Sequence, residues 1–434
     1  MGVMGRVRRW LLIGVVGLCG LPGVAWAESD VDILLNKLVE KGVLNGVEAG
    51  QIRREISESK DTRNAQLAKD LVPESARNWK WKGDLRLRDE MLNQVGTGND
   101  RHRQRIRFRY GTEAKVSDQL KVNFRIATGT ATDPVSTNQT FNTFFLKKAI
   151  FLDLANAEYT PEVPGLSKVS LIGGMMESPL WAVSPMVWDP DLSWDGAALK
   201  LSKELGPTTL FANQGVFSLD SDESEPAALW VIQGGSAYLP LANSQEDILK
   251  NLKLTGALAY HDYVNVSTSA KAGTDPLTRE SDNTSRATDF NQLNPSIELA
   301  SQVAGYPLSV FGDWVHNTSA PSSDNDGWTV GLKVGKAKNP FLTFSDGLNL
   351  KDGWEGGYFF ERLERNAAFD EFVDSDFGGG GTNRRGNVWW VTLATLKNST
   401  LGMKYFASKN LKWDSVTAPK GGENRMQVDW VTKF

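Results

Sequence analysis

Apolar and polar residues alternate with a period of two in successive segments of the chain from Trp79 onward. Such alternation places one kind of side chain on each face of a β-strand. The alternating segments lie at 79–88, 105–116, 120–126, 252–260, 297–303, 306–314, 328–334, 354–360 and 426–434. Each has about 10 residues, the length of a tilted strand that crosses a bilayer. Segment 151–159 carries apolar residues and an acid on both faces, so its faces stay unassigned.

The connections between these segments alternate in length. If the first strand starts on the periplasmic side, the outer loops lie near 90–100, 129–148, 176–195, 218–227, 263–294, 318–326, 363–386 and 408–423. The tight returns lie at 117–118, 206–207, 305–306 and 397–398, and two longer returns lie near 240–250 and 335–352. Long outer loops with short periplasmic turns are typical of bacterial membrane barrels. The pattern therefore predicts an all-β fold, a transmembrane antiparallel β-barrel of about 16 strands over residues 76–434.

A soluble β-sandwich also alternates apolar and polar residues, and two features favour the membrane instead. Every second residue from Arg101 to Arg109 is arginine. Facing lipid, each would cost about 2–4 kcal/mol near the bilayer midplane, so these arginines must face a wet lumen. The last strand ends on Phe434, with Trp430 on the same face, and resembles the assembly signal of outer-membrane barrels.

The first residues have the three parts of a secretory signal peptide. Arg6, Arg8 and Arg9 precede a short apolar run and small residues, so we expect residues 1–27 to be removed before Glu28. The apolar run is too short for a membrane anchor, which needs about 20 residues. Residues 28–75 have apolar positions at helical spacing, interrupted near Gly42, and predict a short helical periplasmic segment whose role the sequence does not tell.

Composition mainly excludes alternatives. The formal net charge is −4, with both signs spread along the chain, which argues against a nucleic-acid partner. Cys19, the single cysteine, lies in the signal segment, and a remaining chain without thiols suits an oxidising compartment. A mean hydropathy of −0.34 fits a soluble protein, but it also fits a membrane barrel, in which only alternate residues face lipid.

Four stretches resemble one known family, the bacterial putative porins of the outer membrane. They are LLNKLVEKGVL at 34–44 followed by Glu48 and Ala49, WDPDLSWDGAAL at 188–199, FGDWVHN at 311–317 and DSDFGGGGTNRRG at 374–386. Their order spans nearly the whole chain after residue 27. The resemblance implies a diffusion channel in the cell outer membrane. The implied partners are lipid with lipopolysaccharide and the barrel assembly machinery, and a homotrimer is left open. It does not name the solute.

Charged residues on the inward parity are the candidate pore lining. Six arginines from three consecutive strands should project from one wall, namely Arg86, Arg88, Arg105, Arg107, Arg109 and Arg125. Four acids of later strands could face them across the lumen, namely Glu298, Asp313, Glu355 and Glu361. Opposed charges of this kind would favour anions near the basic wall. In the alternative, the arginines pair with neighbouring acids such as Asp84 and Glu113 and only solvate the wall.

The third outer loop is unusually apolar for an exposed segment, with Trp181, Met186 and Trp188 among its residues. An exposed loop of this composition would be a sticky patch. We therefore expect it to fold inward and narrow the pore. The alternative is a contact between subunits.

No pattern in the chain predicts an enzyme or a cofactor. His102, His261 and His316 are far apart in sequence, and no nucleophile or phosphate-binding motif is present. Asp189, Asp191 and Asp195 have the spacing that begins a calcium loop, but the rest of that pattern is missing, so calcium stays open. A passive channel for small hydrophilic solutes is the leading hypothesis, and a preference for anions stays open. The alternatives are a ligand-binding β-protein, soluble or in the membrane, and an enzymatic or adhesive barrel.

Overall fold

The computed structural model describes residues 78–434 apart from 96–99, 143, 222–225, 267–282, 284–289, 321–323, 344–346 and 413–421. Of the N-terminal part it describes residues 35, 37–41, 43–52 and 55. The chain divides into two compact units, Met1–Arg77 and Asn78–Phe434. The signal peptide predicted at 1–27 lies outside the described residues.

In the first unit, residues 37–40 and 46–52 are helical. The second of these stretches begins with a capping box. Asn45 Oδ1 accepts the backbone N–H groups of Val47 and Glu48, while the Glu48 side chain accepts the backbone N–H of Asn45. None of the helices in the described part of the chain is long and apolar enough to span a membrane.

In the described part of the second unit, sixteen strands close into an antiparallel barrel, which confirms the predicted fold class. They are β1 (Trp79–Gln94), β2 (Arg101–Lys115), β3 (Leu120–Thr128), β5 (Ile150–Tyr159), β6 (Lys168–Met176), β7 (Trp194–Leu205), β8 (Thr208–Asp220), β9 (Ala227–Tyr238), β10 (Lys253–Val264), β11 (Phe290–Val303), β12 (Tyr306–Asn317), β13 (Asp326–Ala337), β16 (Gly353–Leu363), β17 (Arg384–Leu396), β18 (Ser399–Asn410) and β19 (Gly422–Lys433). The short additions are β4 (Gln139–Thr140), which pairs with β2, the hairpin of β14 (Leu342–Thr343) and β15 (Gly347–Leu348), and α4 (Asp247–Lys250).

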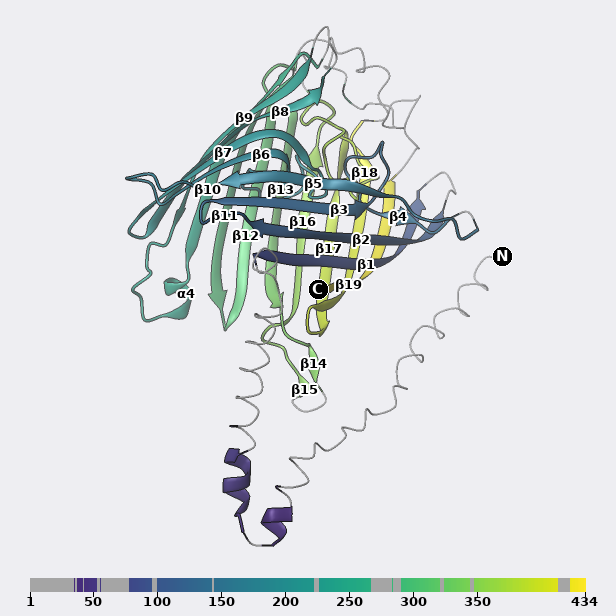
Figure 1. The fold of residues 1–434 in the computed structure, drawn as a ribbon. Coiled ribbons are helices and arrows are strands. Elements are labelled where there is room, and N and C mark those ends of the chain that lie inside the picture. The colour runs from purple at the N-terminus through teal and green to yellow at the C-terminus, as the bar shows by residue number, and fades with distance from the viewer. Residues whose placement is uncertain are drawn as a thin grey trace, which may run out of the picture. The chain divides into compact units, whose positions relative to one another are not determined.

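The barrel closes because the first strand pairs with the last. β1 and β19 lie side by side, dark blue against yellow in Figure 1, with Asp84 opposite Lys433 and Gln94 opposite Glu423. Phe434 extends this seam, since it exchanges two backbone hydrogen bonds with Gly83. Closure leaves no sheet edge, and an open edge could not be satisfied in lipid.

The tight returns fall where the sequence places them. β11 and β12 are joined by Ala304 and Gly305, which both have positive φ, at 52° and 81°. Two positive φ angles match the hairpin turn whose twist suits the flanking strands. The longer returns, 239–252 and 338–352, contain α4 and the β14–β15 hairpin respectively.

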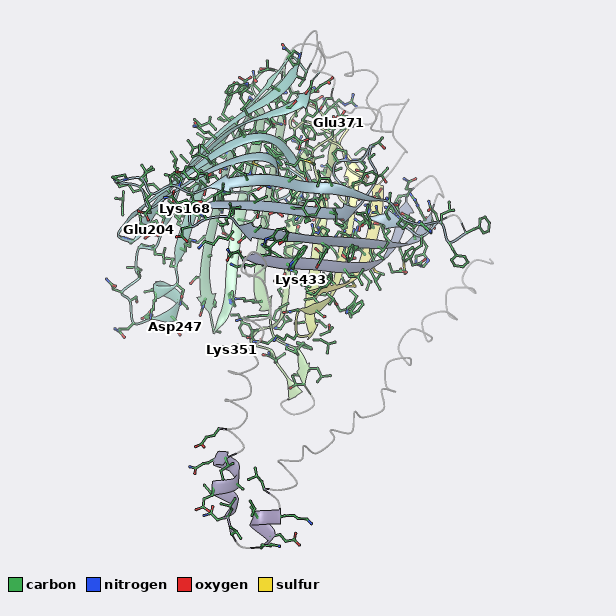
Figure 2. All side chains as sticks on the ribbon, in the orientation of Figure 1. Lys168, Glu204, Asp247, Lys351, Glu371 and Lys433 are labelled. Carbon is green, nitrogen blue, oxygen red and sulfur yellow. The ribbon has the colours of Figure 1, made fainter. Side chains whose placement is uncertain are left out.

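The strands present an apolar face outward, where side chains such as Leu258 and Val330 are half exposed in the isolated chain. The residues of opposite parity face the lumen and are mostly polar. Figure 2 draws the side chains on the strands. This is the arrangement of a barrel in lipid.

The segment whose faces could not be assigned contains a bulge. Arg125 pairs with Leu154 and Ile126 pairs with Leu152, so Asp153 is an extra residue in β5. Both Asp153 and Leu154 are buried, whereas Leu152 is half exposed. The extra residue shifts the parity in mid-strand, and this shift mixes the two faces in the sequence.

Candidate functional site

One outer loop crosses the interior of the barrel. This crossing loop, residues 177–193, joins β6 to β7. On one side its Ser184 hydroxyl donates to Asp313 of β12 at 2.6 Å. On the other side its Asp191 carboxylate lies 3.4 Å from Arg107 of β2. β2 and β12 stand on opposite sides of the closed barrel, so the loop spans the lumen between them.

The crossing loop is fixed to the wall by backbone bonds as well. The Trp181 N–H donates to Gln233 Oε1, and Gln233 Nε2 donates to the Trp181 carbonyl, each at 2.8 Å. Met186 and Trp188 are buried at 0% and 7% exposure. The three residues expected to face inward are therefore held among lumen-facing side chains.

A second loop lies against the first. This glycine-rich loop, residues 364–383, joins β16 to β17 and contains Gly378–Gly381. The Asp189 N–H donates to the Phe372 carbonyl at 2.7 Å, and the Ser375 N–H donates to Asp189 Oδ2 at 2.9 Å. The Ser375 hydroxyl also donates to the carbonyl of Val135, which lies in the outer loop between β3 and β4. The sequence predicts an outer loop at the position of the glycine-rich loop but not its entry into the lumen, although its apolar residues Ala367–Phe369 carry the same signal as those of the crossing loop.

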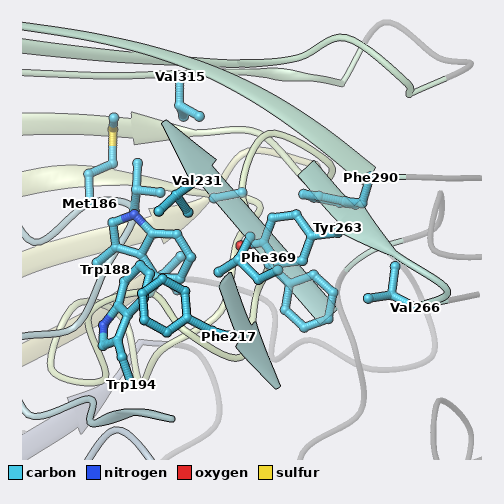
Figure 3. Close-up of a cluster of buried hydrophobic side chains, with 14 of the residues drawn as sticks. Met186, Trp188, Trp194, Phe217, Val231, Tyr263, Val266, Phe290, Val315 and Phe369 are labelled. Carbon is cyan, nitrogen blue, oxygen red and sulfur yellow. The ribbon is translucent and has the colours of Figure 1, made fainter. Parts of the chain in front are cut away.

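Apolar side chains fill the barrel where the two loops meet the wall of β7 to β12. Figure 3 shows Trp188 of the crossing loop beside Trp194 and Phe217, and Phe369 of the glycine-rich loop beside Tyr263 and Phe290. The Trp188 and Trp194 ring centroids are 4.4 Å apart, and those of Tyr263 and Phe369 are 4.9 Å apart. This part of the lumen is therefore packed like a core, and the arginine-rich part lies along β1, β2 and β19.

Each loop is anchored on the arginine wall by the second aspartate of an Asp-x-Asp motif. Asp191 lies 3.4 Å from Arg107 and 3.5 Å from Arg109. Asp376 lies 2.9 Å from Arg88 and 3.3 Å from Arg425 of β19. The structure thus brings the predicted arginines of β1 and β2 together with loop acids that the sequence reasoning did not assign to them.

The predicted arginines also have polar partners on the strands and on other loops. Arg107 and Arg109 share Asp84, at 2.8 and 2.7 Å, as the alternative interpretation expects for that acid. Glu113, the other acid named in that interpretation, instead lies near Lys80 and Lys82. The other contacts are those of Arg86 with Asn138, of Arg105 with Glu90 and Ser136, and of Arg125 with Asp153 and Glu177.

The four predicted acids lie on the other walls and have their own partners. Asp313 accepts hydrogen bonds from Ser184, Asn294 and Ser296. Glu361 accepts one from Thr329, and Glu355 lies 3.3 Å from Lys333. Glu298 lines a cavity. Among the described residues, none of the four is within ion-pair distance of the arginine wall, because the crossing loop lies between.

Among the described residues, two cavities border the crossing loop on the turn side. A cavity of about 840 Å³ is lined by strands β1 to β8 and by Ser178–Trp181. A second, of about 520 Å³, is lined by β11 to β19 and by Ala182, Val183 and Pro185, with Glu298 in its wall. The crossing loop therefore borders both, and both open among charged side chains at the turn end of the strands.

The comparison with protein families agrees with this geometry. The family model described as "Putative porin" matches residues 91–307 and 300–434, most of the chain. The chain belongs to the putative porin family. It is accordingly an outer-membrane channel protein, as the resemblance of its motifs implied.

Among solved structures, this porin is similar to Salmonella typhi OmpF in complex with daunomycin, with 10% identity over 82% of this chain and 97% of that chain and a TM-score of 0.47. It is also similar to Pseudomonas putida OprB at low pH, with 10% identity over 87% and 97% and a TM-score of 0.48. No curated protein matches the sequence. Because both TM-scores lie below 0.5, the family assignment rests on the family model.

The calcium question concerns the same aspartates. Asp189 Oδ1 accepts the Asp191 N–H at 2.8 Å, and Asp191 is occupied by arginines. Among the described residues, no cluster of three or more His, Cys, Asp or Glu side chains is arranged to hold a metal ion.

Two carboxyl groups, those of Asp189 and Asp374, are buried where the two loops meet. Burial and the neighbouring Asp374 carboxylate raise the pKa of Asp189 to about 8, and burial raises the pKa of Asp374. Burial acts on Asp376 too, but Arg88 and Arg425 outweigh it and hold the pKa of that carboxyl well below its usual value. Near neutral pH, the Asp189 and Asp374 pair therefore retains a proton, while the two anchoring aspartates are charged.

We expect the docked loops to loosen as the pH rises. The pKa of Asp189 is 3.8 when the loop is undocked and about 8 when it is docked. Between these two pH values the docked carboxyl is protonated to a greater extent than the undocked one. The free energy of docking therefore becomes less favourable as the pH rises to about 8, and it is constant above that. Open-channel current noise should grow between about pH 4 and about pH 8 and stay level above that. The Asp189→Asn variant, neutral throughout, should show a flat profile. A wild-type profile as flat as that of the variant would contradict this assignment.

Proposed function

We propose that this porin lets small hydrophilic solutes diffuse passively through its lumen and that it favours anions. The observation that carries the proposal is the crossing loop, which spans the barrel and borders two cavities lined with charged residues. A channel narrowed by two docked loops selects by size, and the charges along its walls select by sign.

The balance of charge supports the preference for anions. The larger cavity is lined by basic side chains of Lys82, Arg109, Arg125, Lys168, Lys200 and Lys433. Its acidic side chains are fewer, namely those of Asp84, Glu113, Glu158 and Glu177. Cations in a cleft with low-dielectric walls raise the local concentration of anions.

In this proposal the six predicted arginines have two roles. Arg88, Arg107 and Arg109 hold the loops through Asp376 and Asp191, and so set the width of the path. Arg86, Arg105 and Arg125 border the path and contribute to its potential. Trp181, Met186 and Trp188 form the constriction from the crossing loop, with the four acids Glu298, Asp313, Glu355 and Glu361 on the far wall.

The reversal potential across a planar bilayer under a potassium chloride gradient tests the preference. We expect its sign to be that of a chloride-favouring channel. The shift should shrink as ionic strength rises, because salt screens charges over about 10 Å at 0.1 M. A cation-favouring potential would contradict the proposed selectivity without affecting the channel itself.

The partners named by the sequence analysis stay proposals. Lipopolysaccharide and other outer-membrane lipid would contact the outward apolar face, and the barrel assembly machinery would insert the chain. The third proposed partner is the chain itself, in a homotrimer. The mass of the detergent-solubilised protein measured by light scattering distinguishes a trimer from a monomer.

A further inference from the structure

The larger cavity contains two lysines that form no ion pair with a described residue. Lys168 of β6 and Lys200 of β7 lie on adjacent strands, with Lys168 opposite Ser202 and Lys200 opposite Ser170. Both line the cavity, and Figure 2 labels Lys168 at the end of its strand. In the described part of the chain, neither lysine is within ion-pair distance of a carboxylate, in contrast to the arginines of β1 to β3.

The nearby acid is already engaged. The Glu158 carboxylate accepts a hydrogen bond from Ser170 Oγ at 2.7 Å and lies 3.6 Å from Lys121 Nζ. It contributes to the potential at the two lysines, but its oxygens are directed to other partners. Two neighbouring ammonium groups with uncommitted donors form a place where an anion replaces water.

Neutral polar groups and an aromatic surface adjoin the lysines. Lys200 lies opposite Asn213 of β8, and Asn213 Nδ2 donates to Gln233 Oε1, the atom that also holds the Trp181 N–H. The Trp181 ring lies 6.2 Å from that of Phe211, which stands two residues before Asn213 on β8. Trp181 and Phe211 both line the same cavity.

We propose that Lys168, Lys200, Trp181 and Phe211 form a subsite that binds small aromatic carboxylates on their way through the channel. The carboxylate would take hydrogen bonds from the two ammonium groups, and the ring would lie against the tilted aromatic pair. This subsite rests on the proposed function and gives it a substrate class. It places the anion site on β6 to β8, whereas the sequence analysis placed it at the arginine wall.

Benzoate is the probe, and saturation-transfer NMR on the folded protein in detergent micelles measures its binding without requiring conduction. We expect wild-type protein to bind benzoate more tightly than acetate or benzyl alcohol, which lack the ring and the charge respectively. Lys200→Gln should weaken benzoate binding by about tenfold, the loss expected for one charge-assisted hydrogen bond. Trp181→Leu keeps the backbone hydrogen bonds to Gln233, and it should lower the affinity for benzoate to nearly that for acetate.

Lys203→Gln is the matched control. Lys203 lies three residues further along β7 on the opposite face, is exposed, and does not line the cavity. It should bind benzoate like the wild type. Equal affinity of Lys168→Gln/Lys200→Gln protein and wild type, or equal binding of benzyl alcohol and benzoate, would overturn the subsite. Wild-type protein that binds benzoate but conducts no current would contradict the proposed channel function and leave the subsite standing.

Discussion

Asp376→Ala is expected to destabilise the docked glycine-rich loop by about 3–5 kcal/mol, because removing one partner from a buried charge network leaves the others uncompensated. Asp376 is the shared partner of Arg88 and Arg425, whose side chains are each only 5% exposed. It also accepts a hydrogen bond from Gln427. Arg88 retains Asp429 and Arg425 retains Glu423, so the barrel wall should stay closed while the loop detaches.

Single-channel recording and thermal unfolding of the refolded variant provide the test. We expect larger and noisier current steps together with a lower unfolding temperature. Asp118→Ala is the control, since Asp118 lies in a turn, is 96% exposed and pairs only with Lys115 among the described residues. An exposed pair of this kind contributes little to stability. Asp376→Ala protein that matches the Asp118→Ala control in both measurements would contradict the anchoring role.

Leu258→Arg is expected to lower the stability of the membrane-inserted barrel by about 2–4 kcal/mol, the cost of an arginine on the lipid face near the midplane. Leu258 is near the middle of β10, points outward and is half exposed in the isolated chain. The neighbouring inward residue, Ala259, is fully buried, so the register of β10 cannot shift to hide the charge without burying it in the packed lumen.

Leu254→Arg on the same strand is the depth control. Leu254 lies on the same face as Leu258 but near the turn end, where the same substitution costs about 0–1 kcal/mol. Denaturant titration of both variants folded into lipid vesicles measures the difference. Equal costs at the two positions would mean that β10 does not cross the hydrocarbon as placed here.

The sequence was sufficient for the strands and their connections because alternation is a local signal. The segment predicted at 79–88 lies within β1. The turn predicted at 305–306 is made by Ala304 and Gly305, one residue earlier. The faces of β5 could not be assigned from the sequence because the bulge at Asp153 shifts the parity in mid-strand. In the sequence such a bulge is visible only as a mixture of the two faces.

The partners of the charged residues could not be predicted in the same way. Arg88 and Asp376 are 288 residues apart in the chain, and Ser184 and Asp313 are 129 apart. Parity shows that Arg88 faces the lumen, but not which loop enters the lumen to meet it. The lysines of the larger cavity were overlooked for the same reason, since a free charge is recognised only when all its neighbours are known.

Single-channel conductance of the refolded protein in a planar bilayer tests the central claim most directly. A barrel narrowed by docked loops, with two cavities on the turn side of the crossing loop, predicts discrete and uniform current steps. Asp376→Ala protein should give larger ones. Protein shown by protease protection to be folded and inserted, but giving no steps, would contradict the account, because the loops would then close the lumen instead of narrowing it.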